Sequence, residues 1–160
     1  IQWLKTELKH ISNFNSHIPS SGYYIPGVAM LIKKEVFEKA GLFDEKYFLY
    51  FEDADFSIRT RKYGYSLAVE QEALVNHKVS ASAKKLGSSL ILRYHMRNSL
   101  IFNWLHAPLL YKILMPFWSW WIALRQMIKI LFGIHPKHSK AILCGILDFY
   151  KGKFGKIKYD

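Results

Sequence analysis

Three carboxylates follow an aromatic run in the first half of the chain. Residues 47–51 include four aromatic side chains, and Glu52, Asp53 and Asp55 come directly after them. Carboxylates set against apolar side chains are costly unless a donor or a cation accompanies them. The arrangement therefore indicates either a chemical use, such as removing a proton from a substrate, or a structural use at the start of a helix.

The structural alternative places these acids in the first turn of a helix over residues 53–63. Basic residues follow at the other end of that segment, and Gly64 lies where a left-handed C-terminal cap is expected. Arg59 follows Asp55 by four residues, so the two side chains can form an ion pair on one face. Local sequence leaves catalysis and helix stabilisation open.

Three other residues are candidates for chemistry. His77 follows a short apolar segment, where it serves either as a metal ligand, which neutral imidazole suits, or as a structural residue. Gly27 is needed either in a turn or where the backbone approaches a substrate. Arg97 meets an anion in one interpretation and is solvated or pairs with another helix in the other.

Strands and helices are both expected to position these residues. Apolar composition predicts short strands over residues 28–32, 65–69 and 73–75. Periodicity and capping residues predict helices over residues 34–39, 53–63, 86–106 and 117–132. His77 then lies just past the last of these strands.

Charge is distributed unevenly along the 160 residues, although the net charge is +11. Residues 1–72 hold nine Lys and Arg against ten Asp and Glu, whereas residues 73–160 hold fourteen against two. No acid occurs between Ala73 and Leu147. A basic half that is also rich in Trp, Leu, Ile and Phe predicts an anionic partner.

The length suits one domain or the larger part of one. The chain begins with Ile1 and not with Met, so we expect it to be a processed or excised segment. Its single cysteine, Cys144, argues against a disulfide scaffold or a Cys-type zinc site and fits a reducing compartment.

The helix predicted over residues 117–132 has a narrow polar stripe and a wide apolar arc. The stripe consists of Ser119, Arg125, Gln126 and Lys129. Beyond Pro108 the longest segment free of charge, residues 113–124, is shorter than the ~20 residues that span a bilayer, so we expect binding at a membrane surface. The alternative is that its tryptophans pack against the protein itself or a partner subunit.

Several motifs follow one another along the chain: Gly27 with residues 28–32, residues 41–45, residues 50–56, Arg59, Gly64-Tyr65 and His77, with Arg97-Asn98 further on. In their order and spacing they resemble the second half of a family 2 inverting glycosyltransferase of the rhamnosyltransferase-like kind, which builds bacterial surface polysaccharides. The resemblance covers about residues 22–100.

This resemblance implies an α/β fold. Residues 1–100 would form the acceptor-side half of a GT-A (Rossmann-like) fold, and residues 101–160 would add amphipathic, membrane-associating helices. The sequence Asp53-Ala54-Asp55 has the letters of that family's metal-binding Asp-x-Asp motif but lies at a later position. The nucleotide-binding half and its metal ligands are therefore expected outside this chain, and the fragment alone is expected to be inactive.

The resemblance also implies roles for single residues. Asp53 would be the general base that takes the proton of an acceptor hydroxyl, and Glu52, Asp55 and Gly27 would bind the acceptor or orient the site. His77 would be a late ligand of Mn²⁺ or Mg²⁺ on the diphosphate side. Arg97 would contact a diphosphate or a lipid head group.

The implied function is sugar transfer from a nucleotide-sugar to a lipid-linked or glycan acceptor, at the cytoplasmic face of the bacterial inner membrane and against its anionic surface. The alternative is a noncatalytic domain that binds a membrane surface or an anionic ligand. Nucleic-acid binding is disfavoured because the cations from Lys112 to Lys129 are sparse among large apolar residues, and no glycine-aromatic motif of an RNA-binding sheet is present.

Overall fold

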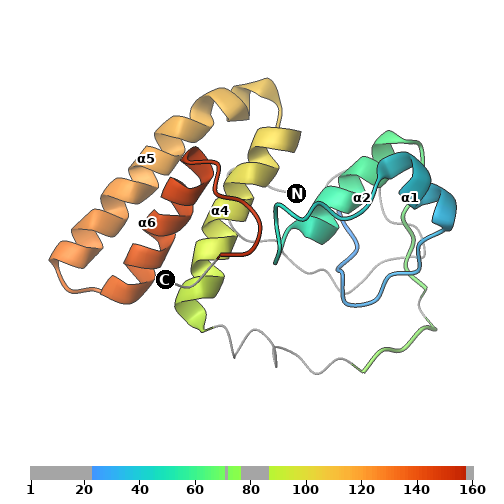
Figure 1. Ribbon diagram of the computed structural model, residues 1–160, viewed down its shortest axis with the longest axis horizontal. Coiled ribbons are helices and arrows are strands. Elements are labelled where there is room, and N and C mark those ends of the chain that lie inside the picture. The colour runs from blue at the N-terminus through green and yellow to red at the C-terminus, as the bar shows by residue number, and fades with distance from the viewer. Residues whose placement is uncertain (1–22, 71, 77–86, 158–160) are drawn as a thin grey trace.

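The computed structural model describes residues 23–70, 72–76 and 87–157. Their helices are α1 (Lys34–Ala40), α2 (Glu52–Lys62), α4 (Ser88–His106), α5 (Leu109–Leu131) and α6 (Pro136–Tyr150). Figure 1 shows α4, α5 and α6 side by side, with the pair α1 and α2 on the other side of α4. The described chain thus forms a three-helix bundle that carries a smaller helical pair.

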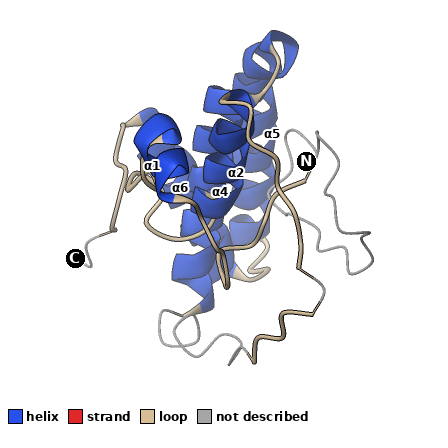
Figure 2. Ribbon diagram, turned by 90° about the vertical axis from the view of Figure 1, so that its right-hand side faces the viewer, coloured by secondary structure: helices blue, strands red, loops and turns tan. Residues whose placement is uncertain are grey.

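The prediction of an α/β fold with half of a GT-A sheet is wrong. The described residues form helices and loops without a sheet, as Figure 2 shows, and only Ala68 is assigned to an isolated bridge. Residues 28–32, expected as a buried strand, lie in a loop in which Leu31 is fully exposed. Because a strand obtains its hydrogen bonds from a neighbouring strand, β-forming composition alone did not produce a sheet here.

The helix predictions are confirmed, with changed ends. α1, α2 and α4 agree with the predicted segments within a few residues, and Gly64 has the positive φ expected of a helix-ending glycine. α5 begins at Leu109, earlier than predicted, and continues through Pro116. α6 was not predicted, although Pro136 at its start is a favourable first helical residue.

The core of the bundle lies between α4, α5 and α6. Buried Met96 and Leu100 of α4 contact Met115 of α5 and Ile146 of α6. A second cluster joins α2 and the loop before it to α4, and a third joins α1 to α2. α4 is therefore the element that both parts of the molecule share.

Close packing between α4 and α6 depends on Gly145. A Cβ atom at this position would lie 2.6 Å from the carbonyl oxygen of Arg93 and 3.2 Å from the backbone nitrogen of Arg97. Both atoms belong to the backbone of α4, so they cannot turn aside as a flexible side chain would. The helices would have to separate to admit a methyl group.

We expect Gly145→Ala to lower the free energy of unfolding by about 1–3 kcal/mol, the usual cost of overpacking. Urea denaturation followed by circular dichroism measures this change. Leu147→Ala is the matched control, since Leu147 lies on the same helix and is half exposed. If Gly145→Ala and the unchanged chain unfold at the same urea concentration, the contact between α4 and α6 is not sterically limited.

Candidate functional site

An extended segment before α1 runs along one face of α2. The amide of Gly27 donates to Oδ2 of Asp53 at 2.9 Å, and the amide of Ile25 donates to Oγ of Ser57 at 3.2 Å. The guanidinium of Arg61 donates to the carbonyl oxygen of residue 23. Two residues of an extended chain span ~6.6 Å, and four residues of a helix span ~6 Å. Alternate residues of the segment therefore lie beside every fourth residue of α2.

This contact brings together two of the predicted site residues, Gly27 and Asp53. The other carboxylate oxygen of Asp53, Oδ1, accepts from the amide of Ala54 at 2.8 Å. A Cβ on Gly27 would lie 3.5 Å from Cβ of Asp53, which is ordinary contact. Glycine is therefore not forced by sterics at this point, but any side chain here would lie beside the carboxylate of Asp53.

Glu52, the neighbouring acid, points to a different environment. Its Oε2 is buried and has no hydrogen-bond partner among the described residues. Burial raises the pKa of Glu52, and the charge of Asp53 raises it further, although a backbone hydrogen bond opposes both effects. Burial, followed by the charges of Asp53 and Glu52, also raises the pKa of Tyr24 to about 12.

Glu52 also lines an open hollow of about 630 Å³. The other lining residues combine aromatic and charged side chains: Phe43, Asp44, Glu45, Lys46, Phe48, Phe154, Gly155 and Lys156. Asp53 is not among them. The hollow is therefore adjacent to the predicted catalytic residue without containing it.

Asp55 is 1% exposed and is the centre of a buried polar group. Its Oδ2 accepts from Nε of Arg59 at 2.7 Å, and its Oδ1 lies 2.6 Å from Nε2 of His106 and 3.5 Å from the hydroxyl of Tyr47. Burial alone raises the pKa of Asp55, but the hydrogen bonds and charges of His106 and Arg59 outweigh it and lower the pKa overall. This burial suits orientation of the site and leaves no surface for an acceptor.

The ion pair predicted between Asp55 and Arg59 on one face of α2 is thus confirmed. The guanidinium of Arg59 also donates to the carbonyl oxygen of Ala40 at the end of α1, and to that of Leu42 at 2.8 Å. One side chain therefore joins α2 to the end of α1.

Arg97, expected at a diphosphate or head group, is buried inside the protein. Its guanidinium donates to the carbonyl oxygens of Tyr47 at 3.0 Å and Gly155 at 2.8 Å, with longer bonds to those of Lys46 and Lys153. An external anion would have to displace these carbonyl groups.

Asn98 binds the same loop from the next position of α4. Its Nδ2 lies within 3.1 Å of the carbonyl oxygens of Tyr47, Leu49 and Tyr50, and its Oδ1 accepts from Nε of Arg97 at 3.0 Å. The two side chains together hold the backbone that leads into α2, and so they position the acids at its beginning.

Sequence reasoning missed His106, Tyr47 and Tyr24 as members of this region. His106 is 51 residues from Asp55 in sequence, and no spacing motif connects the two. Aromatic residues beside the acids were visible in the sequence, but only the fold shows that Tyr47 faces Asp55 and that Tyr24 lies near Asp53.

The expected metal ligand His77 lies outside the described residues. In the part of the chain that the structure describes, no three His, Cys, Asp or Glu side chains gather into a metal-binding group. The described carboxylates at the start of α2 therefore do not fit a metal centre by themselves, and the divalent metal stays a prediction.

Comparison with known proteins identifies two curated relatives. Both are N-acetylglucosaminyl-diphospho-decaprenol L-rhamnosyltransferases, from two strains of Mycobacterium tuberculosis, and each is 31% identical to this chain over 93 residues. The match covers 54% of this chain and 30% of the relative, so the chain spans less than a third of those proteins. No family model matches the chain, and no solved structure matches it. The partial similarity indicates a distant glycosyltransferase-type relationship.

We expect Arg97→Lys to destabilise the protein by about 3 kcal/mol, because a single ammonium group cannot replace the fork that binds carbonyl groups on two separate segments. Urea denaturation measures the loss. Amide hydrogen exchange should increase in residues 46–56 more than in α5. Arg125→Lys, at an exposed position, is the matched control. A uniform increase in exchange would argue against a specific role in holding the loop.

Glu52→Gln should stabilise the fold at neutral pH. The folded pKa of Glu52 is raised, so its ionised form costs stability above that pKa, whereas below the ordinary value of 4.5 the folded and unfolded chains are both protonated. The gain should therefore shrink as the pH falls towards 4.5. Thermal unfolding across a pH series measures it, with exposed Glu45→Gln as the control. A gain that does not change with pH would contradict the burial argument.

Proposed function

We propose that this chain is part of an inverting glycosyltransferase that moves a sugar from a nucleotide-sugar to a lipid-linked or polysaccharide acceptor. The similarity to the two rhamnosyltransferases carries this proposal. Their names make L-rhamnose the first donor sugar to test and N-acetylglucosaminyl-diphospho-polyprenol the first acceptor. Since the match covers 30% of each relative, the activity is proposed for a polypeptide that includes this chain.

In this proposal Asp53 acts as the general base. It removes the proton from the acceptor hydroxyl while the oxygen forms a bond to the anomeric carbon of the donor, and the bond from that carbon to the nucleoside diphosphate breaks. Configuration inverts because the acceptor attacks opposite the leaving group. The proton remains on the carboxyl group of Asp53, and the electron pair of the broken bond leaves with the diphosphate.

The geometry at Asp53 supports this role. The amides of Gly27 and Ala54 each bind one carboxylate oxygen and fix its orientation. A carboxylate oxygen has two lone pairs, so a bond from one amide still allows it to accept a proton. Gly27 is exposed and has no side chain, which leaves room for an acceptor beside the carboxylate.

The neighbouring acids would support Asp53 in different ways. Asp55 is buried with Arg59 and His106, so it would orient the start of α2. Glu52 lines the hollow, so it would contact the acceptor there.

Metal binding is a separate part of the proposal. His77 and the Asp-x-Asp residues expected outside this chain would hold Mn²⁺ or Mg²⁺, which stabilises the charge of a leaving diphosphate when bound.

We expect Asp53→Asn to lower turnover by at least about a hundredfold, the scale of a lost general base. The measurement is L-rhamnosyl transfer from a nucleoside diphosphate sugar to N-acetylglucosaminyl-diphospho-polyprenol, in a polypeptide that joins residues 1–160 to the expected nucleotide-binding part. Asparagine keeps one of the two carboxylate oxygens, so one of the two amides loses its acceptor, and circular dichroism checks that the helical content is retained. Glu52→Gln should cost less.

The matched control is Glu38→Gln, which removes an exposed acid of α1 that pairs with Lys34 and lies outside the lining of the hollow. If Asp53→Asn has nearly the turnover of the unchanged enzyme, Asp53 is not the general base.

Gly27→Val should reduce turnover without unfolding the protein if the acceptor approaches beside Gly27, because the valine side chain would lie against the carboxylate of Asp53.

A further inference from the structure

α5 turns its uncharged polar residues towards the protein. Ser119 is buried, and its hydroxyl group lies 2.7 Å from that of Tyr150 on α6. Gln126 is also buried and accepts a hydrogen bond from Ser139 of α6 at 3.0 Å. The two uncharged residues of the predicted stripe thus serve the contact between α5 and α6, and they are not directed to solvent.

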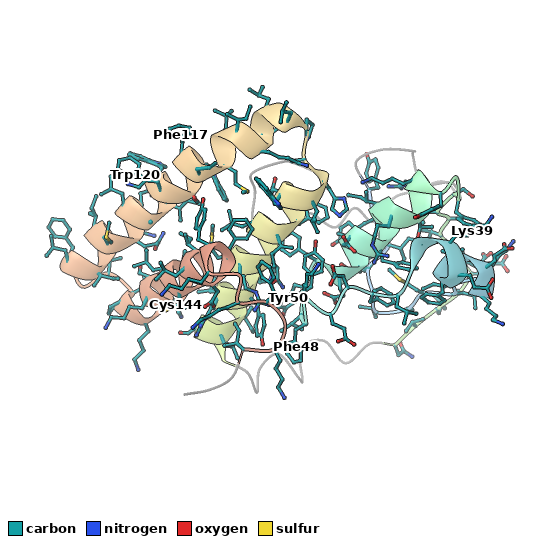
Figure 3. All side chains as sticks on the ribbon, turned by 45° about the horizontal axis from the view of Figure 1, so that its top comes forward. Lys39, Phe48, Tyr50, Phe117, Trp120 and Cys144 are labelled. Carbon is teal, nitrogen blue, oxygen red and sulfur yellow. The ribbon has the colours of Figure 1, made fainter. Side chains whose placement is uncertain are left out.

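The opposite face of α5 consists of large apolar side chains that the described protein does not cover. Phe117 is 70% exposed and Trp120 is 65% exposed, and Leu110, Ile113, Trp121 and Ile128 are also exposed. Figure 3 shows Phe117 and Trp120 on the side of α5 away from α6, on which Cys144 is labelled. At about 100° per residue these positions form one continuous face along the helix.

Charges around this apolar face are positive. Exposed Arg125 and half-buried Lys129 lie at its edge, and further exposed lysines are on α6. The one acid among residues 87–157 is Asp148, which is buried and bound by Arg93 at 2.6 Å. Among these described residues, no exposed carboxylate offsets the cations.

We propose that the outward face of α5 inserts into the surface of an anionic lipid bilayer. Aromatic and aliphatic side chains on one face, with cations beside them, are the arrangement by which helices bind at the level of lipid head groups. None of the described helices combines the length and apolar character required to cross a membrane. In this proposal α5 lies along the membrane surface, with α6 on its water side.

Charge distinguishes this occupant from a second copy of the chain. Two copies that met through α5 would bring their basic surfaces together, and like charges oppose such a contact. An anionic leaflet instead attracts each Lys and Arg near its surface. The same residues that disfavour self-association thus favour lipid.

The test uses the 160-residue chain and vesicles of phosphatidylcholine with or without phosphatidylglycerol. We expect sedimentation with the anionic vesicles at low salt, weaker binding at high salt and little binding to phosphatidylcholine alone. The double change Phe117→Ser and Trp120→Ser should reduce the affinity at least about tenfold, because it removes two apolar anchors. Circular dichroism should show unchanged helical content.

The matched control is the double change Leu42→Ser and Leu74→Ser, which removes two apolar side chains of high exposure from the other half of the chain. It should bind like the unchanged protein. Three results would overturn the proposal: no binding by the folded chain, equal binding to both kinds of vesicle, or binding that the Phe117/Trp120 change does not weaken.

Analytical ultracentrifugation identifies the competing occupant. Self-association that the Phe117/Trp120 change abolishes, without vesicle binding, would assign the face to a second copy and overturn the proposal. The readout is independent of sugar transfer, since Asp53→Asn should bind vesicles like the unchanged chain. A failed transfer assay and a failed lipid assay are therefore distinguishable.

Discussion

The backbone before α2 takes a path that its own residues do not stabilise. Positive φ occurs at three aromatic residues of this loop, Phe48, Tyr50 and Phe51. Such a conformation costs a non-glycine residue roughly 1–2 kcal/mol. Arg97 and Asn98 of α4 donate hydrogen bonds to the carbonyl groups of this loop from inside the protein. The unfavourable path persists because these two adjacent side chains satisfy carbonyl groups that would otherwise be buried without donors.

The same guanidinium also binds the chain after α6, at the carbonyl oxygens of Lys153 and Gly155. That segment returns over the loop, and its residues Phe154 and Lys156 form part of the wall of the hollow beside Glu52. Arg97 thus connects α4, the entrance to α2 and the end of the bundle. The position of the acids is in this way determined by residues far from them in sequence, which explains why local motifs do not reveal it.

Sequence predicted the helices well because their signals are local. Acids at the start and bases at the end of α2, with glycine after it, act within a few residues of each helix end. The prediction of a sheet was wrong because residues 28–32 have strand-like composition but no described partner strand. Strand pairing depends on residues that are distant in sequence. The polar stripe of α5 was found correctly, but sequence does not show which of its members face α6. Contact with Tyr150 and Ser139 shows that Ser119 and Gln126 face inward, whereas Arg125 is exposed.

The three acids at the start of α2 are close together in sequence but have different surroundings in the fold. Arg59 and His106 surround Asp55 and lower its pKa, whereas burial raises the pKa of Glu52. Opposite shifts in neighbouring groups assign them different protonation behaviour. The charge of Asp55 is compensated locally, and that of Glu52 is disfavoured, so together the three acids repel an anion less than three free carboxylates would. In the proposed enzyme, Asp53, held by two backbone amides beside exposed Gly27, is then the carboxylate whose charge the acceptor would meet directly.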